Sequence, residues 1–172
     1  MNHRNALRGD PTLLSEPQWH MRSATEADMR YIASRLTTES LQEIDALSRF
    51  QPVSVLLQNM ERKGVIVDRR KPDWPLAVFE IFGQPGKPAA YWSALTETAL
   101  RQDWYWGFND HVNAILNGMQ SQHPTLLTYV DARNVRQMNW LERTGFHHVE
   151  DIPQYGRLEM PFKLYRRGAP HV

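Results

Sequence analysis

The sequence contains no cysteine. A chain without cysteine has no disulfide framework, no thiolate metal site and no cysteine nucleophile, and it suits a reducing compartment. No stretch approaches the roughly 18 consecutive apolar residues that a membrane-spanning helix needs, so we expect no membrane span. The N-terminal residues lead into no apolar run, and they therefore do not have the form of a signal peptide.

A large charge imbalance is also missing. The 20 Lys and Arg residues are balanced by 19 Asp and Glu residues, which leaves a net charge of +1. Bulk charge therefore does not indicate a polyanion-binding protein. The 172 residues, 41% of them hydrophobic, are enough for one sizeable core. We expect an extended arm over residues 1–18, a single domain over 19–167 and a short tail over 168–172.

Hydrophobic periodicity predicts an alternation of strands and helices within this domain. Apolar residues at helical spacing follow the potential helix cap Thr25, and Leu41, Ile44 and Leu47 show the same spacing in a second segment. A third helical segment ends at Gly64. The predicted order, by residue range, is strand 19–22, helices 25–36, 40–48 and 53–63, strands 64–68, 76–83 and 89–95, helix 103–119, strand 125–130, helix 134–144, and strands 146–150 and 158–165. This pattern favours an α/β fold with a mixed sheet and flanking helices.

Two stretches carry a resemblance to a known family. Residues 21–28 read MRSATEAD, and Asn134 is followed at eleven and twelve residues by Gly145 and Phe146. Asn134 can cap a helix, and Gly145 can take the left-handed conformation that ends it. Together with the order of elements, these stretches resemble the GNAT (GCN5-related N-acetyltransferase) fold over about residues 19–165.

The resemblance implies a coenzyme site that this sequence lacks in part. Such enzymes carry Arg/Gln-x-x-Gly-x-Gly/Ala after the fourth strand, where backbone N–H groups hold the coenzyme A pyrophosphate. If Arg101 opens the motif here, Trp104 and Trp106 stand at the two glycine positions; if Gln102 opens it, only Gly107 matches. The carboxylates of Glu97 and Asp103 would also repel a diphosphate. The position of the family's proton-donating tyrosine, seven residues after Asn134, is Leu141.

One sub-family fits both departures, and this sequence resembles it. Its members are the GNAT-like internal virion or morphogenesis proteins of short-tailed bacteriophages of the autographivirus type. This resemblance implies a role in particle assembly or DNA delivery, in the host cytoplasm or the virion, with virion or host proteins as partners. Our leading hypothesis is therefore a GNAT-like protein that has lost acetyl-CoA binding, needs no cofactor and acts through protein contacts. A host-directed inhibitor that uses the same surface is a third, weaker reading.

The alternative hypothesis is an active N-acetyltransferase with a divergent coenzyme loop. Glu80 lies in an otherwise apolar strand and would be the catalytic base, although such a position more often indicates a solvated strand face or a paired buried charge. If acetyl-CoA binds, the resemblance implies contacts from the segment after the fourth strand and from the capping asparagine. These residues are Leu95, Arg101, Gln102, Asp103, Trp104 and Asn134.

Two further clusters have simpler explanations. His147 and His148 fall on opposite faces of a strand and cannot chelate one ion together, and we predict no metal site. Residues 61–71 contain five basic and two acidic side chains, a local charge of +3, which could contact nucleic acid. No aromatic residues interleave with them, which favours a solvated turn.

Overall fold

A computed structural model describes residues 18–100 and 105–168 of the protein, with side chains for 18–100 and 107–168. The predicted arm and tail lie mainly outside these ranges. The strands are β1 (Trp19–Ser23), β2 (Lys63–Asp68), β3 (Lys71–Phe82), β4 (Ala89–Leu95), β5 (Thr125–Asp131), β6 (His147–Tyr155) and β7 (Met160–Gly168). The helices are α1 (Glu26–Ala33), α2 (Thr38–Leu47), α3 (Pro52–Leu56), α4 (Tyr105–Gln120) and α5 (Val135–Arg143), with single 3-10 turns η1 (Met60–Arg62) and η2 (Glu97–Leu100).

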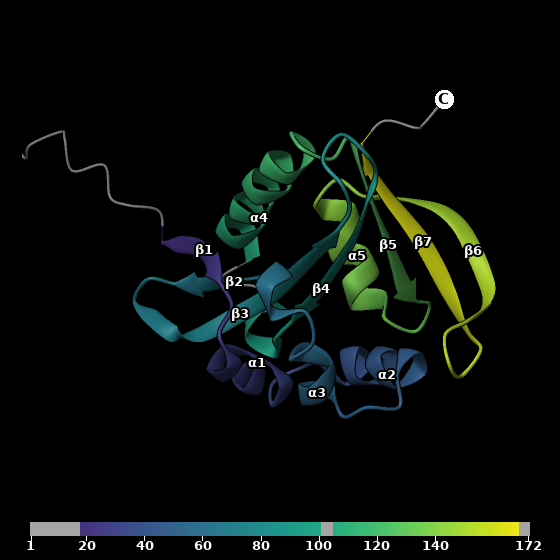
Figure 1. The fold of residues 1–172 in the computed structure, drawn as a ribbon, viewed down its shortest axis with the longest axis horizontal. Coiled ribbons are helices and arrows are strands. Elements are labelled where there is room, and N and C mark those ends of the chain that lie inside the picture. The colour runs from purple at the N-terminus through teal and green to yellow at the C-terminus, as the bar shows by residue number, and fades with distance from the viewer. Residues whose placement is uncertain (1–17, 101–104, 169–172) are drawn as a thin grey trace, which may run out of the picture.

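The seven strands form one mixed sheet in the order β1-β2-β3-β4-β5-β7-β6. Neighbouring strands are antiparallel except β4 and β5, which are parallel. Helices α1, α2 and α3 cover one face of this sheet, and α4 and α5 pack on the other (Figure 1). The predicted α/β fold with a mixed, helix-flanked sheet is confirmed.

Each sheet face has its own hydrophobic core. Met29, Ile32 and Leu56 are fully buried against the strands under α1 to α3. Phe108 of α4 and Trp140 of α5 are buried in the core on the opposite face. Among the described helices, none has the length and apolar character that a membrane crossing requires.

The predicted helix caps are present. The Thr25 hydroxyl accepts from the Asp28 N–H, and the Asp28 carboxylate accepts from the Thr25 N–H at 2.8 Å, which forms a reciprocal capping box. The side chain of Asn134 accepts from the N–H of Gln137 at the start of α5. Gly145, which follows the end of α5, has a φ of 84°, a conformation in which side chains with a Cβ are strained.

The predicted helix over residues 53–63 is wrong in its second half. Helix α3 ends at Leu56, Asn59 takes a left-handed conformation with a φ of 51°, and β2 has begun by Lys63. The side chain of Lys63 donates to the carbonyl of Gln58 in this turn. Gly64 is therefore not a helix stop but a strand residue, paired with Ser23 and Phe79.

Helix α2 buries a different stripe from the predicted one. Leu41 and Leu47 are more than one-third exposed, whereas Glu43 and Ile44 are buried. Two strands are longer than predicted by four residues each: β3 begins at Lys71, and β6 continues through Pro153 to Tyr155. Pro153 is tolerated because β6 is an edge strand and its register with β7 shifts between Ile152 and Tyr155, so that no ladder pair includes Pro153.

Candidate functional site

Strands β4 and β5 separate soon after they begin. Their ladder contains only the pairs Ala89–Leu126 and Ala90–Leu127, and α5 lies between their diverging ends (Figure 1). The N–H of Thr96 donates to the carbonyl of Leu76 on β3 at 2.9 Å. In an antiparallel ladder the backbone direction alternates, so every second residue of β4, including Ser93 and Leu95, turns its backbone N–H and C=O toward β5. We call this region the β4–β5 gap.

Side chains of α5 cross the β4–β5 gap. The Gln137 amide donates to the Ser93 hydroxyl at 3.0 Å, and both side chains are buried. The Arg136 guanidinium donates to both carboxylate oxygens of Glu97 at 3.0 Å each, in the turn that follows β4. The Leu95 side chain is buried in the core beside α4 and α5, so only its backbone faces the gap. These contacts therefore tie α5 to β4 and to the turn after it, beside the stretch where β4 and β5 have no ladder pairs.

The segment after β4 has two backbone N–H groups that are already hydrogen-bonded. It forms the single turn η2, in which the Glu97 N–H donates to the Arg35 carbonyl at 3.1 Å and the Ala99 N–H donates to the Thr96 carbonyl at 3.0 Å. These amides are already used, and the Glu97 carboxylate adds negative charge beside them. These two N–H groups are therefore not available to a phosphate without the loss of a hydrogen bond. Four of the predicted coenzyme contacts, Arg101, Gln102, Asp103 and Trp104, lie outside the described residues.

A buried carboxyl group lies at the carboxyl end of β5, where the sequence pattern did not reveal one. The Glu43 Oε2 accepts from the Asn134 side-chain amide at 3.2 Å and from the Asp131 N–H at 3.3 Å. Burial raises the pKa of Glu43 to about 7, against the lowering effect of these hydrogen bonds. Glu43 can therefore hold or release a proton near neutral pH.

The Asn134 side chain therefore forms two hydrogen bonds within the protein. Its carbonyl oxygen caps α5 and its amide donates to Glu43, and the side chain is buried. Asn134 is one of the predicted coenzyme contacts, and the structure gives it two partners within the protein. Glu43 escaped the sequence analysis because the predicted stripe of α2 ran through Leu41 and Leu47. The sequence signal that indicates its burial is its position beside Ile44 and three residues after Ser40, which are both buried on the same helix.

Glu80 is a paired buried charge. Its Oε2 lies 2.9 Å from the Lys63 Nζ, and the two side chains are 7% and 2% exposed. Its Oε1 is buried and has no hydrogen-bond partner among the described residues, and Glu80 lines a cavity of about 240 Å³ together with Val55 and Trp92. Glu80 lies on the face covered by α1 to α3, opposite Phe79, as the strand alternation predicted. Among the described residues no hydrogen bond or ion pair joins Glu80 to Asn134 or Leu95.

The remaining candidates serve structural contacts. Leu141 is fully buried in the core beside the sheet. The His147 ring lies 3.0 Å from an Arg166 nitrogen, while the His148 ring lies 3.0 Å from Asp151. Within residues 18–100 and 105–168, no group of three or more His, Asp and Glu side chains could hold a metal ion.

Comparison with solved structures places the fold. The chain superposes on a GNAT-family acetyltransferase from Bacillus anthracis with a TM-score of 0.65 and 8% identity, over 87% of this chain and 93% of the other. A ribosomal-protein-S5-alanine acetyltransferase from Vibrio fischeri gives 0.62 and 16% over 88% and 93%. The NatC complex bound to Gag peptide and CoA gives 0.58 and 14% over 89% and 99%. At these identities the likeness shows the GNAT-like fold alone.

No family model matches the sequence, and no curated protein matches it significantly. The superpositions therefore show a GNAT-like fold, and the function has to be argued from the site.

Proposed function

We propose that this chain is a GNAT-fold protein that has lost acetyl-CoA binding and acts through contacts with other proteins. The observation that carries the proposal is the bridging of the β4–β5 gap by Gln137–Ser93 and Arg136–Glu97. A buried neutral hydrogen bond contributes about 1 kcal/mol and a half-exposed ion pair at most about 1 kcal/mol. A ligand that had to break both contacts would bind with an affinity roughly tenfold or more lower. The hydrogen-bonded amides of η2 offer little to offset this cost.

The specific biological role that we propose rests on the sequence resemblance to internal virion and morphogenesis proteins of short-tailed phages. We assign the chain to particle assembly or DNA delivery, with virion or host proteins as partners. Exposed apolar side chains support protein contacts: Leu47, Leu158 and Tyr129 are each more than one-third exposed. Leu47 approaches the turn at Gly156, so α2 and the β6–β7 turn present a common surface.

Thermal unfolding with acetyl-CoA and with free coenzyme A tests the loss of binding. A ligand at a hundred times its dissociation constant stabilises a fold by about 2.7 kcal/mol. For a domain of this size such a stabilisation raises the melting midpoint by several degrees, on the order of 5–10 °C. We expect millimolar acetyl-CoA or coenzyme A to raise the midpoint no more than the same concentration of ADP, which shares only their nucleotide portion. A saturable rise of that size beyond the ADP control would contradict the proposal.

Mass spectrometry of purified particles tests the virion role. If the chain is a virion component, its copy number per particle should be constant across preparations and survive washing in high salt. Its absence from particles, with normal particle assembly when the gene is deleted, would overturn this assignment.

The alternative, an active N-acetyltransferase, is favoured by one observation. Glu43, whose pKa is about 7, is hydrogen-bonded at the end of β5 on the edge of the β4–β5 gap, where it could take a proton from an amine. If purified protein acetylates amines, Glu43→Gln and Glu80→Gln should be compared for their rates. Loss of the rate with Glu43→Gln alone would make Glu43 the base, and loss with Glu80→Gln alone would make it Glu80.

A further inference from the structure

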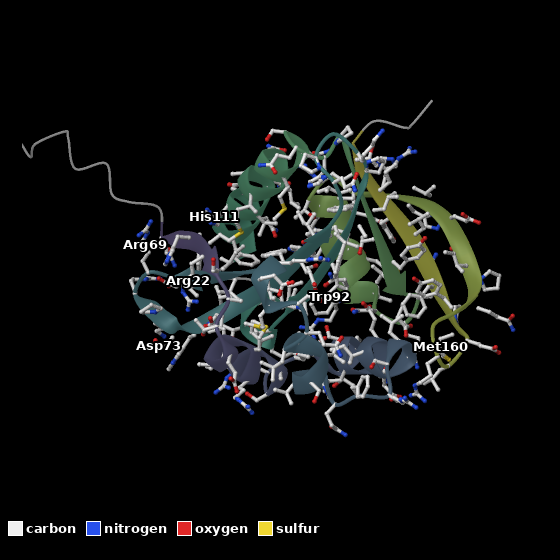
Figure 2. All side chains as sticks on the ribbon, viewed as in Figure 1. Arg22, Arg69, Asp73, Trp92, His111 and Met160 are labelled. Carbon is white, nitrogen blue, oxygen red and sulfur yellow. The ribbon has the colours of Figure 1, made fainter. Side chains whose placement is uncertain are left out.

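A second cavity lies at the other end of the sheet, between α1 and the beginning of β3. It has a volume of about 400 Å³, which is within the range of small-ligand sites. Its walls come from α1 and the turn after it, from the first half of β3 and from the residue after β4: Tyr31, Arg35, Lys71, Trp74, Leu76 and Thr96. Figure 2 shows Arg69 and Asp73 at the neighbouring β2–β3 turn, at the opposite end of the molecule from Met160. We call it the α1–β3 cavity.

Two aromatic rings line the α1–β3 cavity. Tyr31 of α1 and Trp74 of β3 stack with 6.5 Å between ring centroids and 22° between planes. Trp74 is 52% exposed, although burial of an indole ring is strongly favourable. The rings come from segments 43 residues apart in sequence, so their near-parallel alignment is a product of the fold. An aligned pair with one exposed ring, Trp74, and one half-buried ring, Tyr31, is a stacking platform for a flat ring.

Each ring also carries a cation. The Arg35 guanidinium lies 3.8 Å from the Tyr31 ring centre, and the Lys71 ammonium lies 4.7 Å from the Trp74 ring centre. Within the described part of the chain, neither cation forms an ion pair with a carboxylate. Asp68 lines the cavity, but Arg70 neutralises it at 2.7 Å.

The remaining charges near the rim do not cancel these cations. Asp73 is exposed and adjacent to Trp74, and it interacts electrostatically with Arg22, whose guanidinium is bound to Asp28. The basic cluster predicted from residues 61–71 is thereby divided: Lys63 is buried against Glu80, whereas Lys71 reaches the cavity. The structure also supplies the aromatic partners that the linear sequence lacked.

We propose that the α1–β3 cavity binds a nucleotide, with the base stacked on Trp74 and the phosphate held by Arg35 and Lys71. A purely apolar ligand would leave two cations unused, and an acidic peptide would leave the exposed ring pair unused. A planar base joined to a phosphate uses both. The nucleotide is either a free nucleoside monophosphate or one unit of a single strand, and the test distinguishes these sources.

Binding is measured with two probes: a fluorescein-labelled decathymidylate by anisotropy, and thymidine monophosphate by calorimetry. We expect Trp74→Ala to lower the affinity for whichever probe binds by about tenfold or more, because stacking on one ring is lost. Trp74→Phe should retain most of the affinity. For the single strand, Lys71→Gln should reduce the slope of log affinity against log salt by about 0.7, the contribution of one phosphate contact.

The matched control is another exposed pair of cation and ring. The Arg49 guanidinium lies 5.8 Å from the Phe50 ring centre, and Phe50 is 53% exposed. Phe50→Ala and Arg49→Gln should leave binding unchanged. Binding of the strand alone, or of the monophosphate alone, with loss in Trp74→Ala, supports the proposal and identifies the source. No binding of either probe, or equal loss in the Phe50 and Trp74 variants, would overturn it.

Discussion

Replacing Lys63 by methionine is expected to lower the free energy of unfolding by about 3–5 kcal/mol, because Glu80 would be left as a buried charge without its partner. The two side chains are almost completely buried and lie 2.9 Å apart. Lys63 also donates to the Gln58 carbonyl in the turn after α3, so the same change removes a link that shapes this turn. Urea denaturation at pH 7 measures the loss.

Two controls separate the lost pair from a general loss of packing. The double variant Lys63→Met with Glu80→Leu removes both charges and should recover most of the stability, because two apolar side chains need no partner. Arg30→Met, which breaks the exposed pair with Glu26, should cost less than about 1 kcal/mol. A double variant as unstable as the Lys63 single variant would contradict the account of this pair.

Replacing Glu43 by glutamine is expected to raise the free energy of unfolding at pH 8 and to change it little at pH 5. The folded protein holds the Glu43 proton up to a pKa of about 7, whereas the ordinary value is 4.5. Between these values the folded state binds more protons than the unfolded state, so stability falls as pH rises from about 4.5 to 7. The loss is on the order of 3 kcal/mol for such a difference in pKa.

The glutamine oxygen can accept the same hydrogen bonds from Asn134 and Asp131, but it carries no charge that burial would penalise. Denaturation curves at pH 5, 6, 7 and 8 should therefore show a steeper decline for the wild type than for Glu43→Gln. Parallel profiles for the wild type and Glu43→Gln would show that Glu43 does not titrate near neutral pH in the folded state.

Local sequence signals predicted the parts of the fold that neighbouring residues determine. The capping box at Thr25, the cap at Asn134 and the helix stop at Gly145 all depend on contacts within a few residues, and each is present. The end of α3 was missed because it depends on distant partners. Lys63 turns inward to meet Glu80, 17 residues away in sequence, and the helix ends earlier than the apolar spacing predicts.

The candidate site was predictable only in outline for the same reason. The sequence indicated Asn134 and the altered segment after β4. Glu43 and Gln137 become visible only in three dimensions, because their partners are 91 and 44 residues away. Glu80 was correctly placed opposite Phe79, and its pairing with Lys63 required the β2–β3 register. Trp74 and Tyr31 likewise meet only after α1 packs beside β3.

The central claim, that the β4–β5 gap does not accept acetyl-CoA, is tested most directly by a titration followed by two-dimensional ¹H–¹⁵N NMR. The backbone amides of Ser93 and Leu95 report on the gap, and the indole N–H of Trp74 reports on the α1–β3 cavity. We predict no shift at Ser93 or Leu95 with millimolar acetyl-CoA, whatever its nucleotide portion does at Trp74. Saturable shifts at Ser93 and Leu95 would contradict the account and favour the acetyltransferase.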